Sequence, residues 1–356
     1  MAWYNESWTY RVKIIIQSSQ INSDLIDFPV YLRGSDFGAS VYINAKSAAE
    51  DFRFTKADET TELPFEIVSY NSGTNEFEIH VKVDFISNSS DTIIYLYYGN
   101  AGASAYAVTD TYGRNAVWSD YVLVTHDGGA TVDSTGTHTL TANGGLVSGG
   151  VSSPTGSGTN YSSVSKYVNI GANNLNINND FTITTWLDID TDKNQNVILA
   201  SGNSIVSPPG YWMFINRTSV SNGLSMQLDN GPGGALFAPD GTNTVAASDG
   251  WKKVAIVRNG NDYELFIDGA SVDSKTETIS GLNAVDDILI GKLNYGTSVY
   301  LEGSLSELRL IQDTKSSDWI TTEFNNQNSP STFYSVGAEE TNGGGPTFKP
   351  RVNWFM

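Results

Sequence analysis

The stretch from residue 251 to residue 310 constrains the fold more than any other part of the chain, because strand-like segments and turn residues alternate along it. Within residues 263–268, Tyr, Leu and Ile alternate with Glu, Phe and Asp, the period of two that is typical of a half-buried β-strand. Turn residues precede this segment at 259–262 and follow it at Asp268-Gly269. Turns between such segments are hairpin signals. The stretch therefore predicts at least four strands joined by turns.

The order of features in this stretch resembles the C-terminal half of a laminin-G-like or concanavalin-A-like jelly roll. The features are Trp251, the hairpin, the Asp-Gly turn, Ile290-Gly291, and Gly-x-Leu-x-Glu-Leu-Arg at residues 303–309. The resemblance implies a β-sandwich that we expect to span residues 115–340.

The two ends of that second unit carry further similarity to the same family. The entrance, VWSDYVLVTHDG at residues 117–128, is similar to the family pattern but has Asp127 directly after His126. The exit at residues 315–340 resembles the closing segment of such domains, and Ser316-Ser317-Asp318 at its start predicts a helix N-cap.

Residues 1–106 form a separate unit of strand-like segments. Residues 76–86, EFEIHVKVDFI, alternate strictly, which predicts a strand with one core face and one wet face. The series WxxR, FPV, DFRF, LPFEI and IYLYYGN resembles an all-β domain of unknown function that is common in bacterial surface and phage proteins, typically just before a laminin-G-like domain. We expect residues 107–114 to be a connector. The predicted fold class is all-β, with two consecutive β-sandwiches and a short C-terminal docking tail.

The charge of the chain excludes several partners. Of 356 residues, 39 are acidic and 20 are Lys or Arg, which gives a net charge of −19 and disfavours nucleic acid and anionic membranes. No apolar run approaches the roughly 18 residues needed to span a bilayer. No secretory signal is recognisable at the start, and there is no cysteine that would need an oxidising compartment. We expect a soluble protein without membrane insertion.

The last segment, residues 341–356, changes character. A run of glycines precedes two prolines and several apolar residues. We expect this tail to dock either on its own domain or on a neighbouring chain, and we expect the protein to be a homo-oligomer within an assembly. The residues predicted to make that contact are Phe348, Arg351, Trp354 and Phe355.

No motif predicts catalysis. The nucleophile elbow, the phosphate loop and the H-E-x-x-H motif are not present, and the three histidines have no spacing typical of metal ligands. His80 falls on the polar face of its segment, which predicts a solvated side chain. The carboxylates Asp188 and Asp190 share a strand face as a glycosidase pair would, but a solvated strand end is the favoured explanation. Glu264 and Asp268 are explained by the hairpin framework.

Two kinds of ligand are compatible with the loops of the second unit. Oxygen donors alternate in one loop and precede a Gly-rich turn in another, so calcium is a candidate cofactor, although Asx-turns explain both loops without metal. The candidate calcium ligands are Asp190, Asp192, Asn194, Asp229 and Asn230. Sugars bind aromatic faces and amides on rim loops. The candidate glycan-binding residues are Tyr211, Trp212, Asn294 and Tyr295, with a core position for Trp212 as the alternative.

Together these features favour a bacteriophage virion surface protein, a head decoration or fibre protein or a tail receptor-binding protein. Its second domain would present a glycan- or host-binding face, and its first domain and tail would contact other virion proteins. Three alternatives stay open: a bacterial surface or secreted adhesin, a polysaccharide hydrolase, and a purely structural cement protein. We expect a binding protein rather than an enzyme, because fold-level resemblance supplies the lectin interpretation and no catalytic motif is present.

Overall fold

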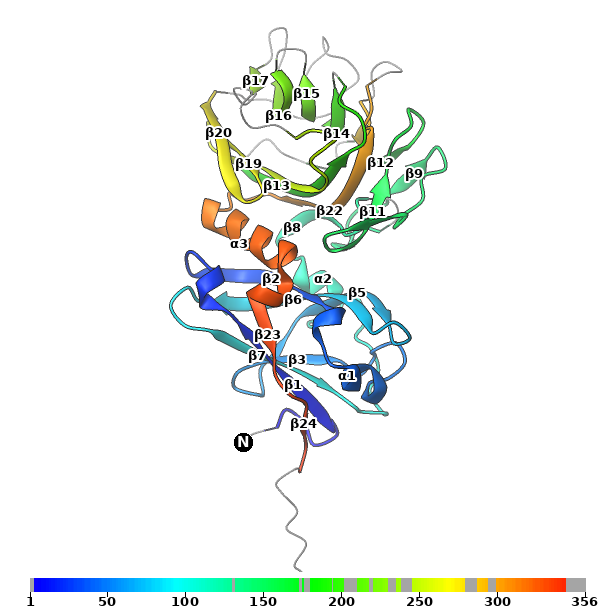
Figure 1. Cartoon of the computed structure of the whole chain (residues 1–356), viewed down its shortest axis with the longest axis vertical. Coiled ribbons are helices and arrows are strands. Elements are labelled where there is room, and N and C mark those ends of the chain that lie inside the picture. The colour runs from blue at the N-terminus through cyan, green and yellow to red at the C-terminus, as the bar shows by residue number, and fades with distance from the viewer. Residues whose placement is uncertain are drawn as a thin grey trace, which may run out of the picture.

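The chain folds into two β-sandwiches that lie one above the other along the long axis, as a computed structural model shows (Figure 1). The structure describes residues 3–129, 132–172, 175, 180–193, 195–201, 210–217, 220–229, 235–237, 245–278, 287–293 and 299–343. The predicted all-β fold class is confirmed, since nearly all regular elements are strands.

The first sandwich packs two antiparallel sheets around a core that includes Ile14, Phe28, Ile79 and Leu96. One sheet has the order β23 (Tyr334–Val336), β1 (Tyr10–Ile16), β7 (Thr92–Tyr98), β3 (Arg53–Lys56), β4 (Glu62–Leu63), and β24 (Glu340–Thr341) also pairs with β1. The other has the order β2 (Leu25–Arg33), β6 (Glu76–Ile86), β5 (Phe65–Asn71). Two short helices, α1 (Ala39–Asn44) and α2 (Arg114–Val117), flank these sheets.

The second sandwich has an eight-stranded and a seven-stranded sheet around a separate core. The eight-stranded sheet has the order β10 (Val151–Ser153), β11 (Gly156–Asn160), β22 (Gly303–Ile311), β13 (Phe181–Ile189), β18 (Lys252–Asn259), β19 (Asp262–Ile267), β20 (Ala270–Thr276), and β8 (Tyr121–Thr125) also pairs with β22. The seven-stranded sheet has the order β17 (Ala235–Phe237), β16 (Val220–Asp229), β15 (Gly210–Arg217), β14 (Asn196–Ser201), β21 (Asp287–Ile290), β12 (Tyr167–Ala172), β9 (Thr141–Asn143).

The predicted hairpin is present as β18 and β19, which pair from Val254↔Ile267 to Asn259↔Asp262. The second turn leads from β19 into β20, and both of its residues have positive φ, 51° at Asp268 and 78° at Gly269. Asp and Gly tolerate this left-handed conformation better than most residues, which is why the Asp-Gly pair marks the turn.

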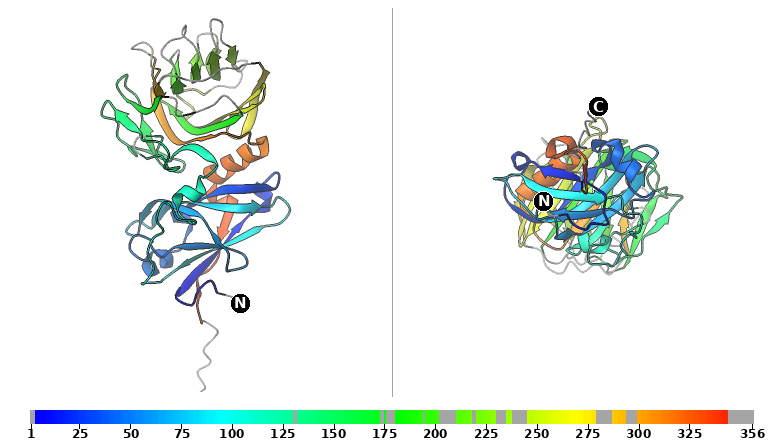
Figure 2. Two further views of the ribbon diagram at one scale, coloured as in Figure 1. Left: turned by 180° about the vertical axis from the view of Figure 1, so that it is seen from behind. Right: turned by 90° about the horizontal axis from the view of Figure 1, so that it is seen from below.

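A helix joins the two sandwiches. After β22 the chain forms α3 (Ser317–Asn328) and α4 (Pro330–Phe333), and α3 lies between the two sandwiches in opposite views (Figures 1 and 2). The Ser316 side chain accepts a hydrogen bond from the Trp319 backbone N–H at 3.2 Å, so the predicted N-cap is present. The Trp319 ring packs edge-on against Phe28 of β2, with ring centroids 5.4 Å apart.

The chain then returns to the first sandwich, which differs from the expectation that residues 115–340 form one domain. Strand β23 pairs with β1 through Ile14↔Val336, and the Arg11 guanidinium forms an ion pair with Glu340 at 2.7 Å. The physical reason is that β1 would otherwise be an edge strand with unpaired backbone groups. In sequence terms, the second sandwich is inserted into the first.

Among the described residues, none of the helices has the length and apolar character needed to cross a membrane.

Candidate functional site between the two sandwiches

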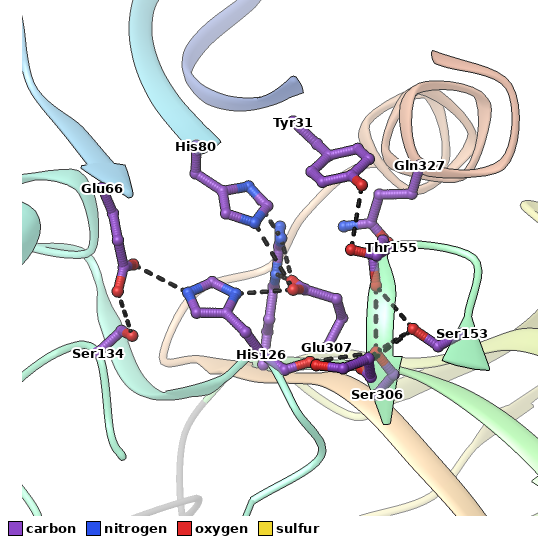
Figure 3. Close-up of polar contacts among 12 residues, drawn as sticks. Tyr31, Glu66, His80, His126, Ser134, Ser153, Thr155, Ser306, Glu307 and Gln327 are labelled. Atoms are coloured by element: carbon purple, nitrogen blue, oxygen red, sulfur yellow. Dashed lines mark hydrogen bonds and ion pairs between the residues drawn. The ribbon is translucent and has the colours of Figure 1, made fainter. Parts of the chain in front are cut away.

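A network of buried charged side chains lies where the two sandwiches meet (Figure 3). The first sandwich contributes groups from the paired positions Glu66↔His80 on β5 and β6, and the second contributes groups from the end of β8 and from β22. The members from the strands are Glu66, His80, Lys253, Glu307 and Arg309, together with His126 after β8 and Glu323 on α3. All of them are buried.

The prediction that His80 is solvated is wrong, because its side chain is fully buried. Its strand alternates as expected, with Ile79 and Val81 in the core of the first sandwich. At His80, however, the polar face of that strand meets the second sandwich instead of water, whereas Glu76 and Asp84 at its two ends are exposed. The His80 and His126 rings stack there with centroids 4.7 Å apart. The sequence contains the alternation but no sign of the partner that covers it.

His126 lies between two carboxylates. Its Nδ1 is 2.7 Å from Oε1 of Glu307, and its Nε2 is 2.9 Å from Oε2 of Glu66. Burial alone would lower the pKa of His126, but the charges of Glu307 and Glu66 outweigh it and raise the pKa to about 10. The imidazole is therefore charged at neutral pH and donates from both nitrogens. A group in this state is not a general base near pH 7.

His80 has the opposite character. Burial lowers the pKa of His80 to about 4, so this ring is neutral beside the charged ring of His126. Its Nε2 lies 3.6 Å from Glu307 Oε1, and its Nδ1 lies 3.4 Å from the Arg309 guanidinium. Two histidines in contact thus differ in charge, because only His126 has a carboxylate on each side.

Arg309 extends the network to the linking helix. Its Nε donates to Glu307 Oε2 at 2.9 Å, and its Nη1 donates to Glu323 Oε1 at 2.9 Å. Lys253 lies 3.6 Å from the same Glu323 oxygen, and burial lowers the pKa of this lysine to about 8. The charges balance when all groups are ionised: Glu66, Glu307 and Glu323 carry three negative charges, and His126, Arg309 and Lys253 carry three positive charges.

One ring nitrogen of His80, one ring nitrogen of His126 and one carboxylate oxygen of Glu307 lie within 4.8 Å of one another, as the ligand atoms of a metal would. A divalent cation placed there would add charge beside Arg309 in a network that is already balanced, and burying net charge is costly. We therefore interpret the network as an ionic contact that holds the sandwiches together. Sequence spacing does not reveal it, because the three residues come from three distant segments.

A cleft of about 640 Å³ opens beside this network. It is lined by β5, by the connector before α2 and by the loops after β8. Burial, followed by the nearby charge of Glu307, raises the pKa of Glu78 in its wall to about 7. Val108 and Val132 also line the cleft and are 48% and 50% exposed. The cleft thus combines polar groups with uncovered apolar surface, which is typical of a binding site.

The predicted glycan residues are only partly described. Tyr211 and Trp212 lie in β15, where their backbones pair with Leu228 and Gln227 of β16. Their side chains, and Asn294 and Tyr295 altogether, lie outside the described residues.

The predicted calcium ligands that the structure describes make contacts within the chain. Asp190 accepts hydrogen bonds from Asn160 at 3.0 Å and from Ser162, and Asp192 accepts one from the Ala247 backbone N–H at 2.9 Å. Asp229 is the last residue of β16, and its side chain, like Asn194 and Asn230, lies outside the described part of the chain. Calcium binding stays a prediction.

The carboxylate pair considered for hydrolysis lies at the end of β13. Burial and the charge of Asp190 raise the pKa of Asp188, which is only partly exposed. Asp268, the other carboxylate considered, pairs with Lys252 at 2.8 Å and accepts the Lys253 backbone N–H at 3.0 Å. These bonds fit its interpretation as part of the hairpin framework.

A group that sequence reasoning missed lies near the predicted calcium loop. Lys193 Nζ lies 3.4 Å from the centroid of the Tyr300 ring and 3.2 Å from Glu302 Oε1, and the Tyr300 hydroxyl donates to that oxygen at 2.7 Å. Lys292 forms an isolated bridge to Tyr300 and lies 4.7 Å from the Tyr167 ring. The available signal was the alternation of Tyr300 and Glu302 just before β22.

The fold defines an all-β protein of two β-sandwiches with a cleft beside their contact. Residues 162–321 match the family model of the concanavalin A-like lectin/glucanases superfamily, and residues 48–113 match a domain of unknown function, DUF2341. The chain therefore carries a concanavalin A-like domain preceded by this domain of unknown function, which confirms both resemblances seen in the sequence. No curated protein matches the chain.

Several solved structures are similar to the chain. One is domain 4 of an extracellular GH43 arabinanase from Geobacillus stearothermophilus, in complex with arabinotriose (14% identity, TM-score 0.47, 57% of this chain and 97% of that one). Another is the binding domain of botulinum neurotoxin serotype D (15% identity, TM-score 0.47, 58% of this chain and 51% of that one). A third is a sialidase CBM40 from Ruminococcus gnavus bound to sialyllactose (18% identity, TM-score 0.38, 47% and 96%). The chain spans about half the length of the toxin domain.

Proposed function

We propose that the second sandwich is a carbohydrate-binding module and that it binds without hydrolysing. The match to the concanavalin A-like lectin/glucanases superfamily supports a carbohydrate ligand. Asp188 and Asp190 do not favour hydrolysis: Asp190 already accepts hydrogen bonds from Asn160 and Ser162. Reducing-sugar release that the variants Asp188→Asn and Asp190→Asn abolish would contradict the non-enzymatic proposal.

The arrangement of the two sandwiches selects the binding face. The outer face of the eight-stranded sheet meets α3 and the first sandwich: Trp186 of β13 donates to Gln327 of α3 at 2.7 Å. The seven-stranded sheet lies on the side away from the first sandwich (Figure 1). In the part of the chain that the structure describes, neither α3 nor the first sandwich covers that sheet, so we propose this sheet and its rim as the glycan-binding surface.

On that rim, we propose that the sugar contacts three residues: Lys193, Tyr300 and Glu302. Because Lys193 Nζ already covers one face of the Tyr300 ring, a sugar ring would stack on the opposite face, with the lysine and Glu302 beside it as a donor and an acceptor for the sugar hydroxyls. The backbone of Glu302 also accepts the Asp190 N–H at 2.9 Å, so the group adjoins the predicted calcium loop. We propose that calcium, if bound there, orders this loop beside the sugar.

A glycan array on the full chain, with and without chelator, tests this function. For any glycan that binds, we expect Tyr300→Ala to weaken affinity by about fivefold, because stacking is worth on the order of 1 kcal/mol. Tyr300→Phe is the matched control, since it keeps the ring and removes only the hydroxyl, and should lose less. An array without any binding would favour the cement-protein alternative. Unchanged affinity of Tyr300→Ala would move the binding face elsewhere.

We further propose that the protein works on the surface of a bacteriophage virion, as a head decoration or fibre protein or a tail receptor-binding protein. The support is the resemblance of its first hundred residues to a domain common in phage and bacterial surface proteins, together with a tail suited to docking. The first sandwich and the tail would contact other virion proteins. Gold-labelled antibodies on particles and cells test this setting: label confined to cells would favour the bacterial adhesin.

A further inference from the structure

The cleft between the sandwiches has the properties of a docking site for an extended segment of protein. Strand β5 is the last strand of its sheet, and no strand among the described residues pairs with its outer edge. Ile67, Val68 and Ser69 of this strand line the cleft. An open strand edge offers backbone hydrogen bonds to an added segment, and nearby pockets select its side chains.

Acidic groups and exposed apolar side chains both line the cleft. The charges of His126 and Glu66 cancel, because these two residues form an ion pair. The other charged residues that line the cleft are three acidic ones, Glu50, Glu78 and Asp127, and one basic one, Arg114. The lining is therefore acidic, although Glu78, whose pKa burial raises to about 7, carries only part of a negative charge at neutral pH. Beside these groups lie the half-exposed Val108 and Val132 described above. An occupant that complements this surface carries positive charge together with large apolar side chains.

One segment of this chain has that composition. After Glu340 the sequence contains no acidic residue, while the thirteen residues from 344 to 356, which lie outside the described part, include Lys349 and Arg351. Three aromatic residues accompany these cations: Phe348, Trp354 and Phe355. In a chain with a net charge of −19, a basic and aromatic tail is the complement of its acidic surface.

We propose that the tail of one copy of this chain docks in the interdomain cleft of a second copy, alongside β5. The two ends of the contact lie on different parts of the molecule. Strand β24, from which the tail leaves, lies at the end of the first sandwich that is farthest from the second sandwich (Figure 1). A contact between unlike surfaces is head-to-tail, so copies can join into open chains or into closed rings, of which the smallest is a dimer that exchanges its tails.

This inference rests on the assembly role proposed above for the tail, and it names the partner. It does not depend on glycan binding, because Tyr300 lies on the rim of the second sandwich and not in the cleft. The glycan array can therefore show no binding while the chain still associates through its tail. Equally, the chain can bind a glycan and yet stay monomeric.

Sedimentation velocity on full-length chains tests the proposal. The wild type should associate as its concentration rises, into dimers that exchange their tails or into larger species. A cleft variant, Glu78→Gln with Asp127→Asn, and a tail variant, Lys349→Glu with Arg351→Glu, should each weaken association by about tenfold or more. Asn at 127 keeps an oxygen that can accept the Gly129 N–H, which Asp127 accepts at 3.1 Å, so the loop should fold normally.

Mixing the two variants gives the decisive comparison. The intact tail of the cleft variant fits the intact cleft of the tail variant, so the mixture should form a one-to-one dimer and stop there. A loss of structure in either variant would not produce this complementation. The matched control, Glu6→Gln with Asp84→Asn, removes two exposed carboxylates outside the cleft and should behave as the wild type.

Three results would overturn the proposal. The first is a wild type that stays monomeric up to roughly the 100 µM range, in which weak contacts already associate. The second is a mixture of the two variants that does not associate. The third is association that the cleft variant loses and the tail variant keeps, because another segment would then occupy the cleft.

Discussion

Replacing Glu307 by Gln tests whether the ionic network holds the two sandwiches together. The Glu307 side chain is 1% exposed and meets two cations, His126 at 2.7 Å and Arg309 at 2.9 Å. Glutamine keeps the shape and one oxygen but removes the negative charge. It also places an amide N–H₂ beside groups that themselves donate, so at least one buried donor loses its acceptor.

The expected cost follows from that geometry. Removing one partner of a buried ion pair destabilises a protein by about 3–5 kcal/mol, because the other charge stays buried without compensation. Here two cations are left with less negative charge. Typical domains unfold with about 5–15 kcal/mol, so this loss is a large share of the total. The pKa of His126 should also fall from its raised value, since Glu307 contributes to raising it.

Urea unfolding followed by tryptophan fluorescence measures this loss, because Trp118 lies against His126 at the interface with ring centroids 5.4 Å apart. Glu302→Gln is the matched control: its side chain is 25% exposed and pairs with Lys193 at the rim, so the change should cost at most about 1 kcal/mol. A Glu307→Gln protein that loses no more free energy of unfolding than the control would refute the interpretation that the ionic network holds the two sandwiches together. A histidine NMR titration provides the independent check on His126.

Further outcomes are expected from the same unfolding assay. Trp319→Ala should lower the free energy of unfolding by about 3–5 kcal/mol, whereas Ile43→Ala, at a side chain 78% exposed, should change it by less than about 0.5 kcal/mol. Gly128→Ala should cost about 1–3 kcal/mol or more, since φ is +83° and a Cβ would lie 2.2 Å from the Leu305 carbonyl oxygen. The folded-state pKa of His126 lies above its ordinary value of 6.5, so its stabilisation is complete below pH 6.5 and is lost as the pH rises through about 10. Equal urea midpoints at pH 7 and pH 10.5 would contradict this expected loss of stability at high pH.

The strands and their turns were predictable because local chemistry dictates them. The hairpin of β18 and β19 follows from alternation and turn residues, and the cap at Ser316 follows from a short polar side chain before an apolar helix. Both depend on neighbours in sequence. The two sandwiches were predictable for a different reason. Their prediction depended on the resemblance of each unit to a known family and not on the period of two.

The surroundings of His80 were not predictable from its strand. A period of two shows that the two faces of a strand differ in polarity, but it does not show what covers the polar face. In β6 that face meets another polar surface, and the network of charges satisfies both. Burial of the centre of a polar face, as at His80, is uncommon, since charged residues are almost never fully buried unless they are paired. The partner, Glu307, lies 227 residues further along the chain.

One signal for Glu307 was present in its own strand. Leu305, Leu308 and Leu310 are all buried, and the spacing of three between the first two breaks the period of two. The structure has a register shift in the pairing of β13 with β22 at this point, and Glu307 has a φ of +51°. A β-bulge inserts one residue and re-aims a side chain. The interrupted leucine pattern therefore indicated an unusual position, although not its partner.

The network is better understood as a device for geometry than as a source of stability. Burying charged groups carries a desolvation cost that a well-packed apolar interface would avoid, so we interpret the balanced charges as a means of specifying one arrangement. Glu66 of the first sandwich meets His126 of the second, and Glu323 of α3 meets Arg309 of β22, so a shifted arrangement would leave buried charges unpaired. The inserted second sandwich is also tethered at both of its ends. Its orientation is therefore fixed, and with it the distance from the open rim to the cleft and to the strand that releases the tail. The proposed glycan-binding surface is thereby held at a fixed angle to the proposed docking contact, as the proposed display on a particle would require.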